Sequence, residues 1–296
     1  MTKAANEPNL TLTASSLPDR STSDNRAARR AVKRSLGLFV SVLDYAPAGT
    51  SDWTTAINDA LLDVGANADK RLHLPAGNYV VSGVLNMAYP VDFFGDGMSL
   101  SVIKPTHLGT GVAITGEFGT GPRVRDMTIG FDTAGATSVA HIQVTNYQNV
   151  GSPTTQYSPD FLYLENLNLT GYGGSKAQYN ILLNGSSRVN DVGGTVAIGL
   201  RSITMRRIVG FNATFRALEL NHVRSGWYGD INLYGGSGGV GGAAVIAPSG
   251  VLSYDNKFFG GSINGTFAIA DSDGTGLYGV TTTVSLGANV TNYVKY

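Results

Sequence analysis

One pattern of apolar and polar positions returns along the chain, in the order apolar, any residue, polar or glycine, apolar, any residue, apolar. Its copies begin about 40, 41 and 23 residues apart, which suits solenoid repeats that carry loop insertions. A second short apolar strand follows each copy. The copies are 124–129, 164–169, 205–209 and 228–233, and the second strands are 142–144, 181–183, 218–220 and 245–246. One such unit cannot bury its apolar side alone, so the pattern predicts coils stacked into an all-β solenoid.

Aligning the four copies predicts which side chains share a column of that solenoid. The interior column should consist of Met127, Leu167, Ile208 and Ile231. The polar column beside it contains Asp126, Asn166, Arg207 and Asp230, and its neighbour contains Arg125, Glu165, Arg206 and Gly229. Because opposite charges and amides alternate between coils, we interpret these columns as a structural ladder rather than an acid–base pair. Residues 186–195 should form a loop that projects from the stack.

Helical periodicity appears first near the N-terminus. Ala28, Val32 and Leu36 recur every four residues among five basic side chains, and Asp24 is the expected N-cap. Residues before about 23 are polar and without a period, which is typical of an arm.

A second helix is predicted between Trp53 and Val64, whose apolar residues fall on one face. Ser51 or Asp52 should cap its start, and Gly65 stands where a left-handed C-terminal residue belongs. So short an amphipathic helix needs an apolar surface beneath it, such as the end of a solenoid. Trp53 is therefore expected in the core rather than in a binding site.

Composition supports a folded protein rich in turns. Glycine accounts for 39 of 296 residues, about twice the usual frequency of roughly 7%. Charged residues make up 14% and the formal net charge is zero, while 42% of residues are hydrophobic, which argues against disorder. The chain has no cysteine, so disulfides and thiolate metal sites are excluded. We see neither a signal peptide nor a membrane helix, and therefore expect a protein that is made in the cytoplasm and is not inserted into a membrane.

Several segments resemble the opening of pectate-lyase-like β-helix proteins, notably bacteriophage tailspikes. These are Val42–Tyr45, the second helix, Leu74–Tyr79 with its Pro-Ala-Gly-Asn turn, and Phe94–Gly97. The resemblance covers about residues 36–104 well and the repeats to about 270 loosely. One departure is the connector 46–52, which lacks the acidic Gly-Asp-rich turn usual in the family.

The resemblance implies a right-handed parallel β-helix with a short helical neck and a capping helix. It also implies a homotrimer on a phage virion that contacts bacterial surface polysaccharide. The expected domains are 1–35 as arm and basic helix for attachment or trimer assembly, 36–279 as β-helix, and 280–296 as a C-terminal strand segment. The expected assembly residues are Arg26, Arg29, Arg30, Val32, Lys33 and Leu36. A merely solvated basic helix remains an alternative, and nucleic-acid binding is disfavoured because the protein is neutral overall.

Chemistry-bearing motifs are scarce. The chain lacks a nucleophile elbow, a P-loop, a dinucleotide fingerprint and an HExxH motif, and its four histidines are scattered, so we expect neither metal nor cofactor. Polysaccharide hydrolysis would need two carboxylates at a defined separation, and no pairing can be derived. Sugar binding needs aromatic faces beside polar groups, and the candidates are Trp227, Asp230, Tyr172 and Tyr234.

Three functions remain. The preferred one is a virion structural protein, a trimeric tail fibre or tailspike that attaches to host glycans, carries further fibre parts, or docks onto other tail proteins through its N-terminal segment. The alternative is a tailspike depolymerase, either a glycoside hydrolase or a lyase. A secreted pectinase-like enzyme is disfavoured by the missing signal peptide and the N-terminal helix.

Overall fold

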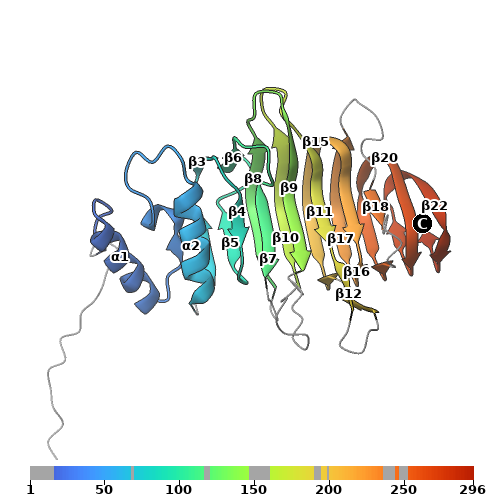
Figure 1. The fold of residues 1–296 in the computed structure, drawn as a ribbon, viewed down its shortest axis with the longest axis horizontal. Coiled ribbons are helices and arrows are strands. Elements are labelled where there is room, and N and C mark those ends of the chain that lie inside the picture. Colours follow the sequence, from blue (N-terminus) through green and yellow to red (C-terminus); the bar gives the residue numbers. More distant parts are fainter. Residues whose placement is uncertain are drawn as a thin grey trace, which may run out of the picture.

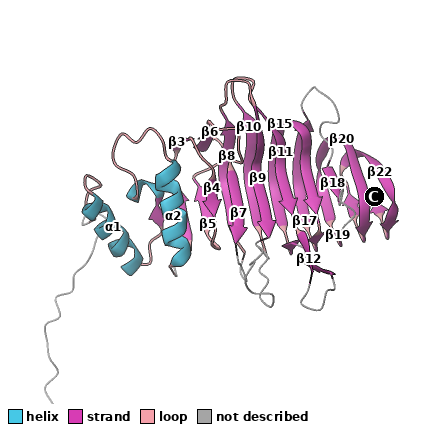
Figure 2. Cartoon of the chain, viewed as in Figure 1, coloured by secondary structure: helices cyan, strands magenta, loops and turns pink. Residues whose placement is uncertain are grey.

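Parallel strands in consecutive coils form one elongated stack. The computed structural model describes residues 17–67, 70–116, 121–146, 161–189, 195–198, 200–235, 244–246 and 253–296. Two helices lie at the N-terminal end and the C-terminus lies at the opposite end (Figure 1). Between them, the strands of successive coils pair in parallel within one large sheet (Figure 2). The predicted parallel β-helix is confirmed.

Each coil contributes strand segments to three parallel ladders. The first ladder contains β1 (Val40–Ser41), β2 (Arg71–Leu74), β5 (Asp92–Gly95), the first parts of β8 (Arg123–Phe131), β10 (Tyr163–Gly171), β15 (Thr204–Asn221), β17 (Trp227–Gly235) and β20 (Lys257–Asp273), then β21 (Gly276–Tyr278) and β23 (Val294–Lys295). Because β15 and β20 run on into the other ladders, they bend with the coil instead of ending at its corners.

The second and third ladders follow in each coil. The second contains β3 (Gly77–Val81), β6 (Ser101–Pro105) and the later parts of β8, β10, β15, β17 and β20. The third contains β4 (Leu85–Met87), β7 (Val112–Gly116), β9 (Thr137–Asn146), β11 (Lys176–Asn184), the end of β15, β18 (Ala244–Ile246), the end of β20 and β22 (Thr281–Thr291). The C-terminal segment thus pairs within the same stack.

The interior column has the predicted composition. Met127, Leu167, Ile208 and Ile231 pair coil to coil, and none is more than 3% exposed. The structure explains why a glycine, Gly210, interrupts the sequence pattern. A Cβ there would lie 2.5 Å from the amide nitrogen of Asn180 and 2.8 Å from Leu233, so the glycine makes room for a buried amide.

The predicted polar column marks the bend between the first and second ladders. Asp126, Asn166, Arg207, Asp230 and Gly260 have φ values of +60°, +53°, +51°, +52° and +64°. Glycine adopts this left-handed conformation freely and Asn or Asp tolerate it, whereas a side chain such as arginine does so at a cost. Turning the chain by one left-handed residue keeps the apolar residues on both sides directed into the core.

Three short strands pair at the remaining corner: β14 (Leu200–Arg201), β16 (Val223–Arg224) and β19 (Ser253–Tyr254). The segment 186–195, predicted as a loop, is described only at 186–189 and 195, which belong to strands, and residues 190–194 lie outside the described residues. Two antiparallel strands, β12 (Ser186–Val189) and β13 (Thr195–Ile198), form a separate two-stranded sheet. Backbone hydrogen bonds between them satisfy groups that a plain loop would leave to water.

Helix α2 (Thr54–Ala66) covers the N-terminal end of the stack, as predicted, and buries Ile57, Ala60, Leu61 and Val64. The prediction of Ser51 or Asp52 as the N-cap was wrong, because the N-cap is Trp53, which makes no side-chain cap bond. Asp52 nevertheless accepts a hydrogen bond from the Thr54 N–H at 3.0 Å. Trp53 is partly buried against the core and packs edge-on against Tyr79 at 4.9 Å.

The prediction for Gly65 was wrong. This residue lies inside α2 and is buried, and the C-cap is Asn67. A Cβ at Gly65 would lie 2.4 Å from the Cβ of Tyr89. The glycine is therefore required by close packing rather than by a left-handed turn.

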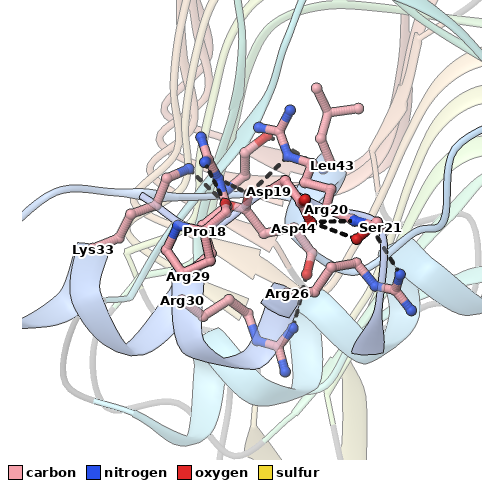
Figure 3. Close-up of polar contacts among 11 residues, drawn as sticks. Pro18, Asp19, Arg20, Ser21, Arg26, Arg29, Arg30, Lys33, Leu43 and Asp44 are labelled. Carbon is pink, nitrogen blue, oxygen red and sulfur yellow. Dashed lines mark hydrogen bonds and ion pairs between the residues drawn. The ribbon is translucent and has the colours of Figure 1, made fainter. Parts of the chain in front are cut away.

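Helix α1 (Ser23–Ser35) docks through charge rather than through apolar contact. Its N-cap is Thr22, whose hydroxyl accepts from the Asn25 N–H, so the prediction of Asp24 as the cap was wrong. The fully buried carboxylate of Asp44, in the 3₁₀ helix η2 (Val42–Asp44), accepts from Lys33 at 2.6 Å, Arg29 at 2.9 Å and Arg20 at 3.1 Å (Figure 3). Surrounding one carboxylate with three cations compensates for its lost hydration.

Candidate carbohydrate-binding face

The outward side of the first ladder carries two columns of polar and aromatic side chains, here called the polar–aromatic face. Strand alternation places them on either side of the buried column, because successive side chains point to opposite faces. The first column contains Arg71, Asp92, Arg123, Tyr163, Thr204, Trp227 and Lys257, and the second contains His73, Phe94, Arg125, Glu165, Arg206, Gly229, Phe259, Tyr278 and Tyr296.

Ion pairs cross between coils on the N-terminal half of this face. Arg125 binds Asp92 through two nitrogens at 2.9 and 3.0 Å and binds Asp126 at 2.8 Å. The next coils continue the ladder, because Asn166 donates to Asp126 at 2.8 Å and Arg207 lies 2.5 Å from Glu165. These contacts agree with the structural ladder expected from the sequence.

The ladder sets the protonation state of Glu165. Burial alone would raise the pKa of this carboxyl, but hydrogen bonds from Arg207 and Tyr163 outweigh it, and the pKa lies below its usual value. A general acid in glycoside hydrolysis needs a raised pKa so that it keeps a proton near neutral pH. Glu165 is therefore suited to an ion pair and not to proton donation.

An aromatic stack occupies the C-terminal half of the same face. The centroids of Trp227 and Phe259 lie 4.8 Å apart, those of Phe259 and Tyr278 5.0 Å, and those of Tyr278 and Tyr296 5.6 Å. Interplanar angles of 26°, 11° and 17° mean that the rings face one another. The inner rings therefore present only their edges, while Trp227 keeps one uncovered face.

The uncovered face of Trp227 is turned toward β15. Strand β17 pairs with β20 on one side and β15 on the other, and Phe259 of β20 covers the β20 side. Trp227 is 59% exposed, and both Asp230 and Arg206 are exposed nearby in the same ladder. An exposed indole beside hydrogen-bond donors and acceptors is the arrangement that binds a sugar ring.

The structure separates the four predicted sugar-binding residues. Trp227 lies on the polar–aromatic face and Asp230 at the bend that ends it. Tyr234 lies at the far end of β17, where it stacks on Phe211 at 5.1 Å. Tyr172 follows β10, and Lys104 lies 4.9 Å over its ring. Each of the two tyrosines thus packs against a side chain of another coil, away from the polar–aromatic face.

Sequence reasoning missed three members of the stack: Phe259, Tyr278 and Tyr296. The repeat was traced only as far as residue 233 in its full form, because the later coils contain glycine where the earlier copies have apolar or polar side chains. The available signal was an aromatic residue directly after a buried apolar one, as in Phe258–Phe259 and Leu277–Tyr278.

The predicted assembly residues are engaged within the chain. Arg29 and Lys33 bind Asp44, and Arg30 donates to the Asp44 carbonyl at 2.8 Å. Arg26 donates to the Arg20 carbonyl at 3.1 Å. Val32 is half-buried and Leu36 is 38% exposed. A groove of about 600 Å³ lies between α1 and α2, and ion pairs from Arg30 and Arg34 to Asp63 cross it.

A smaller aromatic and charged cluster lies on the third ladder. Tyr179 packs edge-on against Phe215 at 5.6 Å, and the guanidinium of Arg216 lies 4.4 Å over the Phe215 ring. Glu219 is 6% exposed and binds Arg216 at 2.5 Å and Asn221 at 2.6 Å. Both oxygens of this single carboxylate therefore accept hydrogen bonds from neighbouring side chains.

The described residues contain neither a candidate metal site nor a membrane-spanning helix. Within those ranges, no group of three or more His, Asp or Glu side chains is arranged to hold a metal ion. In the same part of the chain, no helix combines the length and the apolar character needed to cross a membrane.

Solved structures with similar coils include three proteins. The catalytic unit of a thermostable GH87 α-1,3-glucanase from Streptomyces thermodiastaticus strain HF3-3 is 16% identical, with 86% of this chain and 55% of that chain covered and a TM-score of 0.34. ORF18 of Geobacillus virus E2 is 12% identical, with 92% and 62% covered and a TM-score of 0.30. The A-module of the mannuronan C-5 epimerase AlgE6 from Azotobacter vinelandii is 14% identical, with 87% and 99% covered and a TM-score of 0.25. The chain thus spans less than two thirds of the first two.

No curated protein matches the sequence significantly. A family model does, over residues 39–241, and its description is rhamnogalacturonase A/epimerase, pectate lyase-like. That range is more than half of the 296 residues. With the stacked parallel coils of the structure, the match shows that the chain belongs to the pectate-lyase-like family of rhamnogalacturonase A and epimerases.

Proposed function

We propose that the chain is a subunit of a bacteriophage tail fibre or tailspike that attaches to bacterial surface polysaccharide without cleaving it. The phage assignment rests on the resemblance of residues 36–104 to the opening of tailspikes. The observation that carries the attachment function is the exposed indole of Trp227 at the junction of an ion-pair ladder and an aromatic stack.

Binding without cleavage fits the state of the acids on this face. Asp92, Asp126 and Glu165 each form an ion pair with an arginine, and hydrogen bonds from Arg207 and Tyr163 hold the pKa of Glu165 below its usual value. Both glycoside hydrolase mechanisms need one carboxyl group that holds a proton and another at a defined distance from it. A depolymerase that used these three acids would have to release at least one of them from its ion pair.

Incubation with purified capsule or lipopolysaccharide tests the proposal. The expected result is co-sedimentation of the protein with the polysaccharide, with no increase in reducing ends and no unsaturated products. A Trp227→Ala variant should lose co-sedimentation, and a Trp53→Phe variant, changed at the core tryptophan, should retain it. Release of oligosaccharide would establish the depolymerase alternative instead.

We further propose that three copies associate on the virion, with the N-terminal segment docking onto another tail protein. Six cations on or beside α1, of which several are held by Asp44 and Asp63, make this end of the molecule a charged attachment surface. The mass of the particle in solution, measured by light scattering, should be three times the 31.0 kDa of one chain. A monomer at micromolar concentration would contradict the trimer.

A further inference from the structure

Gly229 occupies an outward position in the middle of β17 where nothing local requires glycine. Its φ lies outside the left-handed region, so any L residue can adopt its backbone conformation. A Cβ built there would meet only the Cγ of Arg206, at 3.9 Å, an ordinary contact. Glycine in a paired strand is otherwise unfavourable and often marks a place where a ligand approaches the backbone. The missing side chain therefore leaves a space that packing within the chain does not fill.

The Gly229 gap lies in the second column of the polar–aromatic face, between Arg206 on one coil and Phe259 on the next but one. Two strand spacings separate those neighbours, about 9–10 Å at the backbone. Trp227 stands in the adjacent column of the same strand, and Asp230 follows at the bend. The gap is thus bounded by the indole of Trp227, the Cγ of Arg206 and the neighbouring residue Asp230, and all three residues are exposed.

These groups match the chemistry of a pyranose ring. A sugar has an apolar C–H face that stacks on an indole, and its hydroxyls both donate and accept hydrogen bonds. Arg206, whose side chain also reaches Tyr163 of the preceding coil, supplies donors and Asp230 supplies acceptors. A charge on the sugar would be attracted by one of these groups and repelled by the other, so it would gain little to offset the loss of its hydration. Charges of both signs around one small space favour an uncharged ring.

We propose that the Gly229 gap is the subsite that holds one uncharged hexopyranose unit of the bound polysaccharide, stacked on the open face of Trp227. The proposal rests on the glycan-binding function proposed above and names its site and ligand class. The proposal requires that the sugar lie directly against the backbone of Gly229. Any side chain at this position would therefore occupy the place of the sugar.

The two tryptophans of the chain allow a direct optical test. In a Trp53→Phe background, the fluorescence of Trp227 alone reports on the gap. The full chain is titrated with laminarihexaose and maltohexaose as uncharged probes, with purified neutral capsule oligosaccharide, and with hexagalacturonate as the acidic probe. We expect an uncharged probe to shift the emission, and hexagalacturonate to bind about tenfold more weakly or not at all.

Gly229→Val fills the gap in a strand-compatible way, and Asn232→Val is the matched control on the outward side of β17 in the second ladder. Gly229→Val should weaken binding of the uncharged probe about tenfold or more with an unchanged melting temperature, and Asn232→Val should leave binding intact. Binding that survives Gly229→Val but is lost in Trp227→Ala would overturn the gap and leave the glycan-binding function standing. Preference for hexagalacturonate would overturn the ligand class, and failure of all probes and of whole capsule would overturn both proposals.

Discussion

The ammonium of Lys33 lies 2.6 Å from Oδ2 of Asp44, and Lys33 is the residue of α1 that is buried. The helix therefore turns its cations toward the β-helix and leaves Ala27, Ala31 and Ser35 exposed. In most amphipathic helices the apolar side packs inward. Here the order is reversed, so the attachment of α1 depends on one carboxylate and its hydrogen bonds.

Replacing Asp44 with Asn should detach α1 while the coils stay folded. The variant leaves three cations around a neutral amide, and breaking a buried ion pair costs about 3 kcal/mol or more. Trypsin should then cleave within α1 about a hundredfold faster than in the unmodified protein. Asp19→Asn is the matched control, since Asp19 is exposed and, among the described residues, its carboxylate accepts hydrogen bonds from Ser21 and Asn25. Equal cleavage of both variants would show that other contacts hold the helix.

Stability should fall between about pH 6.5 and pH 4 because of His141. The side chain is 1% exposed, and desolvation lowers its pKa to about 4, against the opposing effect of the Thr170 carbonyl 2.6 Å from Nε2. The unfolded chain binds the proton below about pH 6.5 while the folded protein does not, so unfolding becomes easier as pH falls through this window. The full effect is about 3 kcal/mol. Urea denaturation of His141→Leu should show a shallower pH dependence, and identical curves for both proteins would rule out this histidine.

Met127→Ala should destabilise the interior column. The side chain is fully buried between Leu167 of the next coil and the preceding coils, and truncation of a buried methionine costs about 2–5 kcal/mol. The midpoint of urea unfolding should decrease accordingly. Asn78→Ala, at an exposed outward position of β3, should change stability by no more than about 0.5 kcal/mol. A comparable loss in both variants would contradict the assignment of Met127 to the core.

Arg207 offers a test of backbone strain. Its φ of +51° is left-handed, and Gly260 holds the equivalent position two coils further along. Arg207→Gly and Arg207→Ala both lose the ion pair with Glu165, so their difference isolates the backbone. The glycine variant should be more stable by about 1 kcal/mol. If the alanine variant were equally stable in urea, the bend would not be strained.

Repeat periodicity predicted much of the fold and less of the candidate site. Met127, Leu167, Ile208 and Ile231 could be aligned from sequence because burial on one side imposes the same spacing in every coil. The neighbours of Trp227 could not, because its stack with Phe259 joins two different columns on successive coils.

Two glycines show the same limit. In the sequence, Gly65 looks like a helix end and Gly210 like a break in the repeat. In the structure, Gly65 makes room for Tyr89 and Gly210 makes room for Asn180. The sequence shows that a glycine is present at each position. The reason for it is the side chain that a distant segment packs against that position in the fold.

By itself, the sequence determined that this chain coils, where its apolar side points, and that two helices lie near its N-terminus. These properties follow from periodicity, which acts on neighbours along the chain. The tertiary structure decided which face of α1 packs inward, which aromatic rings stack, and where a space remains open on the polar–aromatic face. Those outcomes depend on contacts between residues of different coils. Because the loops between coils differ in length, residues that are in contact lie at irregular separations along the sequence.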